Sequence, residues 1–204
     1  MIAIVDYEAG NLTSVKRALD YLGLENIITP DPSVITGAER VIFPGVGHAA
    51  SAMKTLLERK LDKALHDAFA KGIPILGICL GTQIILSRSE EGDTQCLGLL
   101  DGFCPKFKLS NPLLKIPHIG WNAVTYRKEH PVLDGIAQND EFYFVHSYYP
   151  VPSDTDCIIA TAEYEIEFPV ILGKNNLIAT QFHPEKSGPS GLRLLSNFSK
   201  WNGK

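Results

Sequence analysis

The chain has 204 residues, 45% of them hydrophobic, which is enough to bury a substantial core in one domain. Its 19 basic and 23 acidic residues include no clustered run of lysine and arginine, which argues against nucleic acid as a partner. The N-terminus lacks the basic region of a signal peptide and the apolar stretches are too short to span a bilayer, so we expect a cytoplasmic protein without a membrane partner.

Short β-branched runs alternate with amphipathic segments in the first eighty residues. This alternation is typical of a parallel sheet covered by helices. The long amphipathic segment has apolar residues at helical spacing, with a break expected near Lys60. Strands are predicted at Ile2–Val5, Ile27–Thr29, Arg40–Phe43 and Ile73–Ile78, and helices at about Leu12–Leu22 and Ser51–Gly72.

Beyond about residue 100 the pattern changes to strand-like runs separated by turns, which predicts an antiparallel extension. A helical pattern returns at Gly188–Trp201. No repeat or linker divides the chain, so we expect one α/β domain over residues 1–204. The strand-like runs are Lys106–Leu109, Asn122–Tyr126, Phe142–His146, Ile158–Glu163, Val170–Leu172 and Leu177–Gln181.

The sharpest local motif is Gly77-Ile78-Cys79-Leu80-Gly81, between a buried strand and a helical run. Small residues on both sides of a nucleophile permit a tight strand-to-helix turn, here with cysteine in the place of serine. The amide of Leu80 would then form half of an oxyanion hole. By itself the motif is equally compatible with a buried cysteine in a core turn.

A second motif, Gln181-Phe182-His183-Pro184-Glu185, lies at the end of a predicted strand. Alternate residues of a strand project to the same side, so we expect Glu185 to contact His183 and to fix its tautomer. The other ring nitrogen could take the proton of Cys79. His183 alone could equally be a surface histidine, but its combination with Cys79 favours catalysis.

A third motif follows the strand at Arg40–Phe43 and contains Gly45, Val46 and Gly47. The two glycines let the backbone approach a ligand or take positive φ, so this loop can provide the second oxyanion N–H. Without the other two motifs it would be an ordinary βα loop.

Together these motifs resemble the class I glutamine amidotransferases, and the similarity spans nearly the whole chain. The resemblance implies a three-layer, flavodoxin-like α/β domain with a mixed, mostly parallel central sheet and an antiparallel β extension. It implies a Cys79-His183-Glu185 triad that hydrolyses L-glutamine, with neither metal nor organic cofactor. It also implies that Gln83 and groups near His146, Ser147 and Tyr148 hold the glutamine.

Three further segments, Asp6–Leu12, Pro117–Asn122 and Phe144–Tyr149, are similar to the glutaminase subunits of imidazole glycerol phosphate synthases. That similarity implies a partner, the cyclase subunit, a (β/α)₈ barrel that uses the ammonia in histidine biosynthesis. One departure is Glu8, where glycine is expected in the family, which leaves the conformation of that turn open.

Other histidines and cysteines are weaker candidates. His48, His118 and His146 have no carboxylate two residues later, and Cys96, Cys104 and Cys157 lack a nucleophile turn and are expected to be reduced packing thiols. Three alternatives remain open: a class I glutaminase serving another synthase, a free-standing γ-glutamyl hydrolase or cysteine peptidase, and a non-catalytic regulatory subunit. The Pro117–Asn122 segment argues against the first.

Overall fold

Eight strands form the central sheet of the computed structural model, which describes residues 1–204. Its parallel part runs in the order β2 (Asn26–Thr29), β1 (Ile2–Val5), β3 (Arg40–Gly45), β4 (Ile75–Cys79) and β14 (Leu177–Thr180). Antiparallel pairing then continues through β13 (Ile166–Lys174), β12 (Ile158–Tyr164) and β9 (Thr125–Tyr126). The predicted mixed, mostly parallel sheet is therefore confirmed, and its parallel part has the flavodoxin-like strand order.

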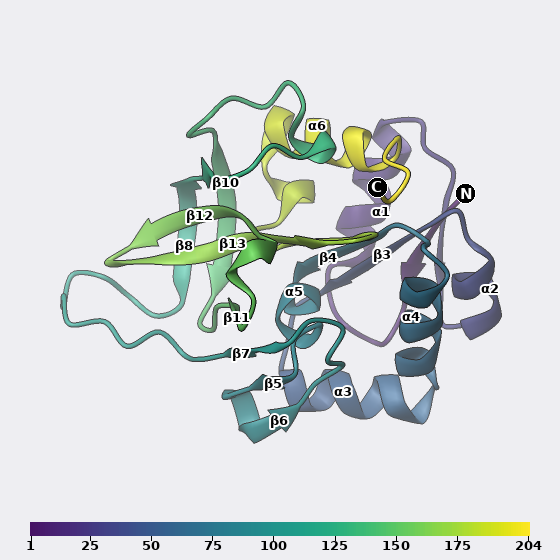
Figure 1. Ribbon diagram of the computed structural model, residues 1–204, viewed down its shortest axis with the longest axis horizontal. Coiled ribbons are helices and arrows are strands. Elements are labelled where there is room, and N and C mark those ends of the chain that lie inside the picture. Colours follow the sequence, from purple (N-terminus) through teal and green to yellow (C-terminus); the bar gives the residue numbers. More distant parts are fainter.

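Helices cover both faces of the sheet (Figure 1). α1 (Leu12–Tyr21) and α6 (Gly188–Phe198) pack on one face, whereas α2 (Pro32–Gly37), α3 (Ala49–Glu58) and α4 (Leu61–Ala70) pack on the other. Successive strand residues point to opposite faces, so Ile4 contributes to the core under α1 while Ala3 and Val5 contribute to the other. The three-layer prediction is confirmed.

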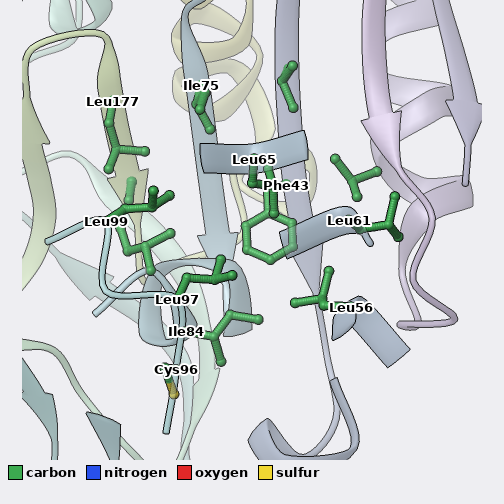
Figure 2. Close-up of a cluster of buried hydrophobic side chains, with 14 of the residues drawn as sticks. Phe43, Leu56, Leu61, Leu65, Ile75, Ile84, Cys96, Leu97, Leu99 and Leu177 are labelled. Carbon is green, nitrogen blue, oxygen red and sulfur yellow. The ribbon is translucent and has the colours of Figure 1, made fainter. Parts of the chain in front are cut away.

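Phe43 of β3 lies at the centre of the core on the α3 and α4 side (Figure 2). Leu56 of α3 and Leu65 of α4 surround its ring, and all three side chains are fully buried. The segment predicted as one helix with a break is divided at Lys60, whose left-handed φ of 60° separates α3 from α4. The expected break is thus confirmed.

Two small sheets extend the domain beside the central one. β8 (His118–Ala123) pairs antiparallel with β10 (Glu141–His146). The other small sheet has the order β11 (Val151–Pro152), β7 (Gly102–Cys104), β5 (Arg88–Ser89) and β6 (Thr94–Gln95). The remaining elements are α5 (Leu80–Ile84) and the short 3₁₀ turns η1 (Glu91–Asp93), η2 (Pro131–Leu133), η3 (Thr155–Cys157) and η4 (Pro184–Lys186).

Several local predictions differ from the structure. The strand expected at Lys106–Leu109 is wrong, because Lys106 makes only one isolated bridge, to Tyr148. The run Asn122–Tyr126 is divided between the end of β8 and β9. Helix α2 was missed, although its start signal is present: the Asp31 side chain caps Ser33 N and proline follows directly. The two-residue strands β5, β6 and β11 were also missed, since they are too short to show a period.

None of the helices has the length and apolar content that crossing a membrane requires. No group of three or more His, Cys, Asp and Glu side chains is arranged to hold a metal ion.

Candidate active site

Cys79 occupies a sharp turn between β4 and α5. Its backbone has φ 53° and ψ −103°, a left-handed conformation that is rare for a residue with a side chain and costs free energy. A Cβ added to Gly81 would lie 2.0 Å from the Phe43 carbonyl oxygen, and one added to Gly77 would lie 3.1 Å from Ala179 Cβ. Gly81 is therefore required by the close approach of the β3 backbone, whereas a side chain at Gly77 would only be tightly packed against Ala179, and both small residues agree with the nucleophile-turn motif.

His183 and Glu185 are in direct contact, with 2.7 Å between His183 Nδ1 and Glu185 Oε1. Both side chains are fully buried. The predicted contact is present, but the expected reason for it is wrong. β14 already ends at Thr180, and Pro184 starts the 3₁₀ turn η4, so the turn rather than a strand face brings the two side chains together.

The charges around His183 favour its protonated form. Burial acts to lower the pKa of His183, but negative charge on Cys79 and then Glu185 outweighs it and raises the pKa to about 10. His183 Nε2 is buried and has no hydrogen-bond partner, whereas Nδ1 is bound to Glu185. The ring nitrogen opposite Glu185 is thus the one without a bound partner.

A cavity of about 240 Å³ opens beside Cys79. This volume suits a ligand of amino-acid size better than a folded peptide. The predicted oxyanion and substrate residues all line it except Gly45, whereas the side chains of His183 and Glu185 are buried and do not line it. The lining residues are Val46, Gly47, Cys79, Leu80, Gln83, Glu91, Pro117, Val145, His146, Ser147 and Tyr148.

Sequence reasoning missed Glu91 in this lining, and it noted Pro117 and Val145 only within motifs. Glu91 lies in the short turn η1, and its Oε2 accepts a hydrogen bond of 2.7 Å from Ala49 N at the start of α3. The Val145 carbonyl oxygen lies 3.8 Å from Cys79 Sγ. No local pattern marks either residue, because a backbone carbonyl and an isolated glutamate carry no sequence signal.

The loop after β3 contains two glycines with different roles. A Cβ added to Gly45 would lie 1.8 Å from the hydroxyl oxygen of Tyr7, a buried group without a hydrogen-bond partner. Gly47 has φ 131°, and a Cβ added there would meet no atom within 4 Å. Gly45 is thus fixed by close packing, whereas Gly47 is fixed by its backbone conformation.

Gln83 is tied to the backbone on the far side of the cavity. Its Nε2 donates to the Tyr148 carbonyl oxygen at 2.9 Å and to Gln181 Oε1 at 3.2 Å. Gln181 Nε2 in turn lies 3.7 Å from Cys79 Sγ. These contacts link α5, the segment after β10 and the nucleophile turn around one cavity.

His118 and His146 lie opposite each other on the paired strands β8 and β10. Their rings are bound through His118 Nδ1 and His146 Nε2 at 3.0 Å. His146 Nδ1 lies 2.8 Å from the Tyr148 carbonyl oxygen, which can only accept, so Nδ1 carries the proton and Nε2 accepts from His118. His146 thus lines the cavity with both ring nitrogens engaged within the protein. Neither histidine contacts Cys79 or a carboxylate in the way that His183 does.

Both rings are neutral at physiological pH. Burial lowers the pKa of His118 to about 4 and that of His146 to about 3. Because the unfolded chain binds protons from about pH 6.5 and the folded chain does not, the stability that the neutral rings contribute is lost as the pH falls below about 6.5.

We expect this loss to appear as a difference between the wild type and His118→Gln, whose amide can still donate to His146 but does not titrate. Between pH 7 and pH 5 the wild type should lose about 2 kcal/mol more of its free energy of unfolding than the variant. Urea unfolding at both pH values measures this difference, because the contributions of the other histidines to the pH dependence are the same in both proteins. Parallel pH dependence in the two proteins would show that His118 is protonated in the fold.

The remaining candidates have structural positions. His48 is the N-cap of α3, where its Nδ1 accepts from Ala50 N. Cys96, Cys104 and Cys157 are buried and free, and burial raises the pKa of each thiol, that of Cys96 to about 11. The turn at Glu8, left open above, takes a left-handed φ of 64°.

Comparison with known proteins gives the following similarities. The model of the class I glutamine amidotransferase family matches residues 3–201. The imidazole glycerol phosphate synthase subunit HisH of Nitratidesulfovibrio vulgaris (strain DSM 19637 / Miyazaki F) is 51% identical over 203 residues, covering 97% of this chain and 95% of the relative. Subunit HisH 1 of Methanococcus maripaludis is 46% identical over 202 residues, covering 97% and 98%.

Solved structures share the fold at low identity. A glutamine amidotransferase superposes with a TM-score of 0.73 at 20% identity and covers 100% of both chains. PurLQS from Thermotoga maritima gives a TM-score of 0.74 at 17% identity, covering 98% of this chain and 97% of that one. These structures support the α/β architecture of the domain.

Proposed function

Since the chain belongs to the class I glutamine amidotransferase family, and within it to the HisH subunits of imidazole glycerol phosphate synthase, we propose that its site hydrolyses L-glutamine and that a cyclase subunit uses the ammonia. The observation that carries this proposal is the cavity beside Cys79, together with the buried His183–Glu185 pair, whose histidine is influenced by Cys79. The cyclase would make imidazole glycerol phosphate and aminoimidazole carboxamide ribotide in histidine biosynthesis. We place the chain in the cytoplasm with that pathway.

Cys79 acts as the nucleophile of this mechanism. Its sulfur attacks the side-chain amide carbon of glutamine, and the carbonyl π electrons move onto oxygen to give a tetrahedral oxyanion. The amides of Leu80 and of the Gly45–Gly47 loop stabilise that oxyanion. When the oxyanion collapses, the C–N bond breaks and His183 gives its proton to the leaving nitrogen, which departs as ammonia.

The second half of the reaction uses the same histidine as a base. Neutral His183 takes a proton from a water molecule, whose oxygen attacks the thioester carbon. The C–S bond then breaks, glutamate is released and the sulfur of Cys79 leaves as the anion. Glu185 keeps the ring oriented and stabilises the imidazolium, as the 2.7 Å contact between them supports.

Substrate would be held by the cavity lining. Gln83, His146, Ser147 and Tyr148 surround the space next to Cys79, and Glu91 adds a carboxylate that can pair with the α-ammonium group of glutamine. Neither a metal nor an organic cofactor takes part in these steps.

The cyclase partner is proposed to be a (β/α)₈ barrel that docks over the cavity mouth. Ile119 and Trp121 of β8 are 60% and 54% exposed, an unusual degree for large apolar side chains, and Pro117 of the same segment lines the cavity. A surface that combines exposed apolar groups with access to the site suits delivery of ammonia to a partner.

An electrophilic glutamine analogue tests the identity of the nucleophile. We expect it to label Cys79 alone among the four cysteines, because burial raises the pKa of the other three thiols. Labelling should fall at least about tenfold in His183→Ala, which removes the proton acceptor, and should be unchanged in His66→Ala, an exposed histidine of α4. Peptide mapping by mass spectrometry locates the label.

Equal labelling of Cys96, Cys104 or Cys157 in the native protein would contradict the proposed role of the turn. The two remaining function classes are separated by turnover. A free-standing hydrolase would release glutamate from γ-glutamyl peptides without the cyclase, and a regulatory subunit would release none from glutamine even with the cyclase present.

A further inference from the structure

Asn11 begins helix α1 but does not cap it with its side chain. An asparagine at this position normally accepts a hydrogen bond from the second or third helical N–H. Here the residue has a left-handed φ of 79° and makes no side-chain cap bond. Only its backbone carbonyl serves the helix, accepting from Ser14 N and Val15 N.

The side-chain amide of Asn11 instead reaches the candidate triad. Asn11 Nδ2 lies 2.5 Å from Glu185 Oε1 and 3.2 Å from His183 Nδ1. The same Glu185 oxygen also accepts a hydrogen bond from His183 Nδ1 at 2.7 Å. Because the proton on Nδ1 points at the carboxylate, the ring nitrogen cannot accept, so the amide N–H of Asn11 donates to Glu185.

Glu185 depends on this donor because it is otherwise poorly satisfied. Its side chain is fully buried, and Oε2 has no hydrogen-bond partner. A buried carboxylate with few donors can rotate or take up a proton, and either change would release His183 from its orientation.

We propose that Asn11 is a positioning residue of the triad: its amide holds the Glu185 carboxylate against His183, which keeps the free ring nitrogen aligned with Cys79. This inference rests on the proposed glutaminase function. Asn11 touches neither the substrate cavity nor the sulfur, so it acts through Glu185 alone.

The choice of asparagine follows from two requirements at one position. Among residues with a side chain, asparagine and aspartate best tolerate a left-handed backbone, and glycine tolerates it freely. Of these three, only asparagine supplies an N–H donor. Asn11→Gly and Asn11→Asp therefore form a matched pair of variants that both preserve the backbone. The first removes the N–H donor, and the second replaces it with a carboxylate.

The test is the pH dependence of glutamate release by the complex of this chain with the cyclase. Asn11→Gly should lower kcat about 10- to 100-fold and change KM by much less, because misorientation of the ring affects the chemical step. Asn11→Asp should also move the acid limb of the kcat/KM profile to higher pH, since two buried carboxylates in contact repel each other, which raises the pH at which the pair takes up a proton and Glu185 loses its charge. The titratable groups that face His183, namely Cys79, His146 and Glu185, are unchanged in both variants, as is Arg17 of α1, which lines a surface groove with Glu185.

A merely structural role would lower the folded fraction without moving the acid limb. Synthesis from added ammonia by the same complexes, together with the thermal unfolding midpoint, checks that the variants are folded and docked. Wild-type kcat and an unmoved acid limb in both variants would overturn the role of Asn11. If Cys79→Ala also kept its glutaminase activity, the proposed function itself would fail, which separates the two outcomes.

Discussion

Replacing Cys79 by alanine is expected to abolish glutamine hydrolysis, lowering kcat by at least about 10⁴-fold. The reaction forms a bond to sulfur, and no other thiol is available, because Cys96, Cys104 and Cys157 are buried outside the cavity lining. Alanine also fits the turn, since it adds nothing to the space that the cysteine fills. Glutamate release measured with saturating glutamine and with the cyclase present gives the loss directly.

The same variant should still support synthesis from added ammonia at the wild-type rate, because the cyclase chemistry does not need Cys79. This measurement is the control for folding and docking. If the alanine variant still released glutamate, another nucleophile would be at work and the assignment would be wrong. If synthesis from ammonia were lost as well, the substitution would have damaged the fold or the interface.

Binding of the cyclase with its ligand is expected to raise the glutaminase rate of the chain, mainly through kcat and by about 10²- to 10³-fold, the contribution of one oxyanion donor. The loop next to Cys79 can provide such a switch. Gly47 has φ 131° with open space around it, so the peptide groups next to it can rotate without a clash. A rotated peptide withdraws its N–H from the cavity.

The residues on both sides of Gly47 are held, because the start of α3 is bound through Ala49 N to Glu91 Oε2. A Cβ on Gly10 would lie 2.7 Å from Val46 Cγ2, and Gly45 is pressed against Tyr7, so the beginning of the loop is packed while Gly47 is free. A partner that docks near Pro117 would act on Gly47 across the cavity that both residues line. Loss of one donor weakens the transition state more than the bound glutamine, so KM should change less than kcat.

Steady-state glutamate production by the chain alone, with the cyclase, and with the cyclase plus a bound substrate analogue measures this activation. The Cys79→Ala chain mixed with the cyclase is the blank, and Ile119→Ser, which changes an exposed residue of β8, should weaken activation without changing the rate of the isolated chain. Full activity of the isolated chain, unchanged by the partner, would favour a free-standing amidohydrolase.

The amino-acid sequence by itself determined most of the central sheet, although in the small sheet beside it the six-residue strand β8 was predicted only at its end. The local spacing of apolar residues predicted strands β1, β2, β3 and β14, the break at Lys60 and helix α6. It also predicted the nucleophile turn, because Gly77 and Gly81 flank Cys79 within five consecutive residues, although the atom that excludes a Cβ at Gly81 belongs to the neighbouring strand β3. Motifs of this kind record a local backbone shape.

Only the tertiary structure decided how distant segments meet. Asn11 and Glu185 are 174 positions apart, and their contact depends on α1 beginning beside η4, which no local pattern encodes. The same holds for Glu91, which reaches the cavity from a three-residue turn, and for His183 and Glu185, which a proline-initiated turn rather than a strand brings together. Periodicity reports which face of an element is buried, whereas the packing of whole elements decides which side chains share a site.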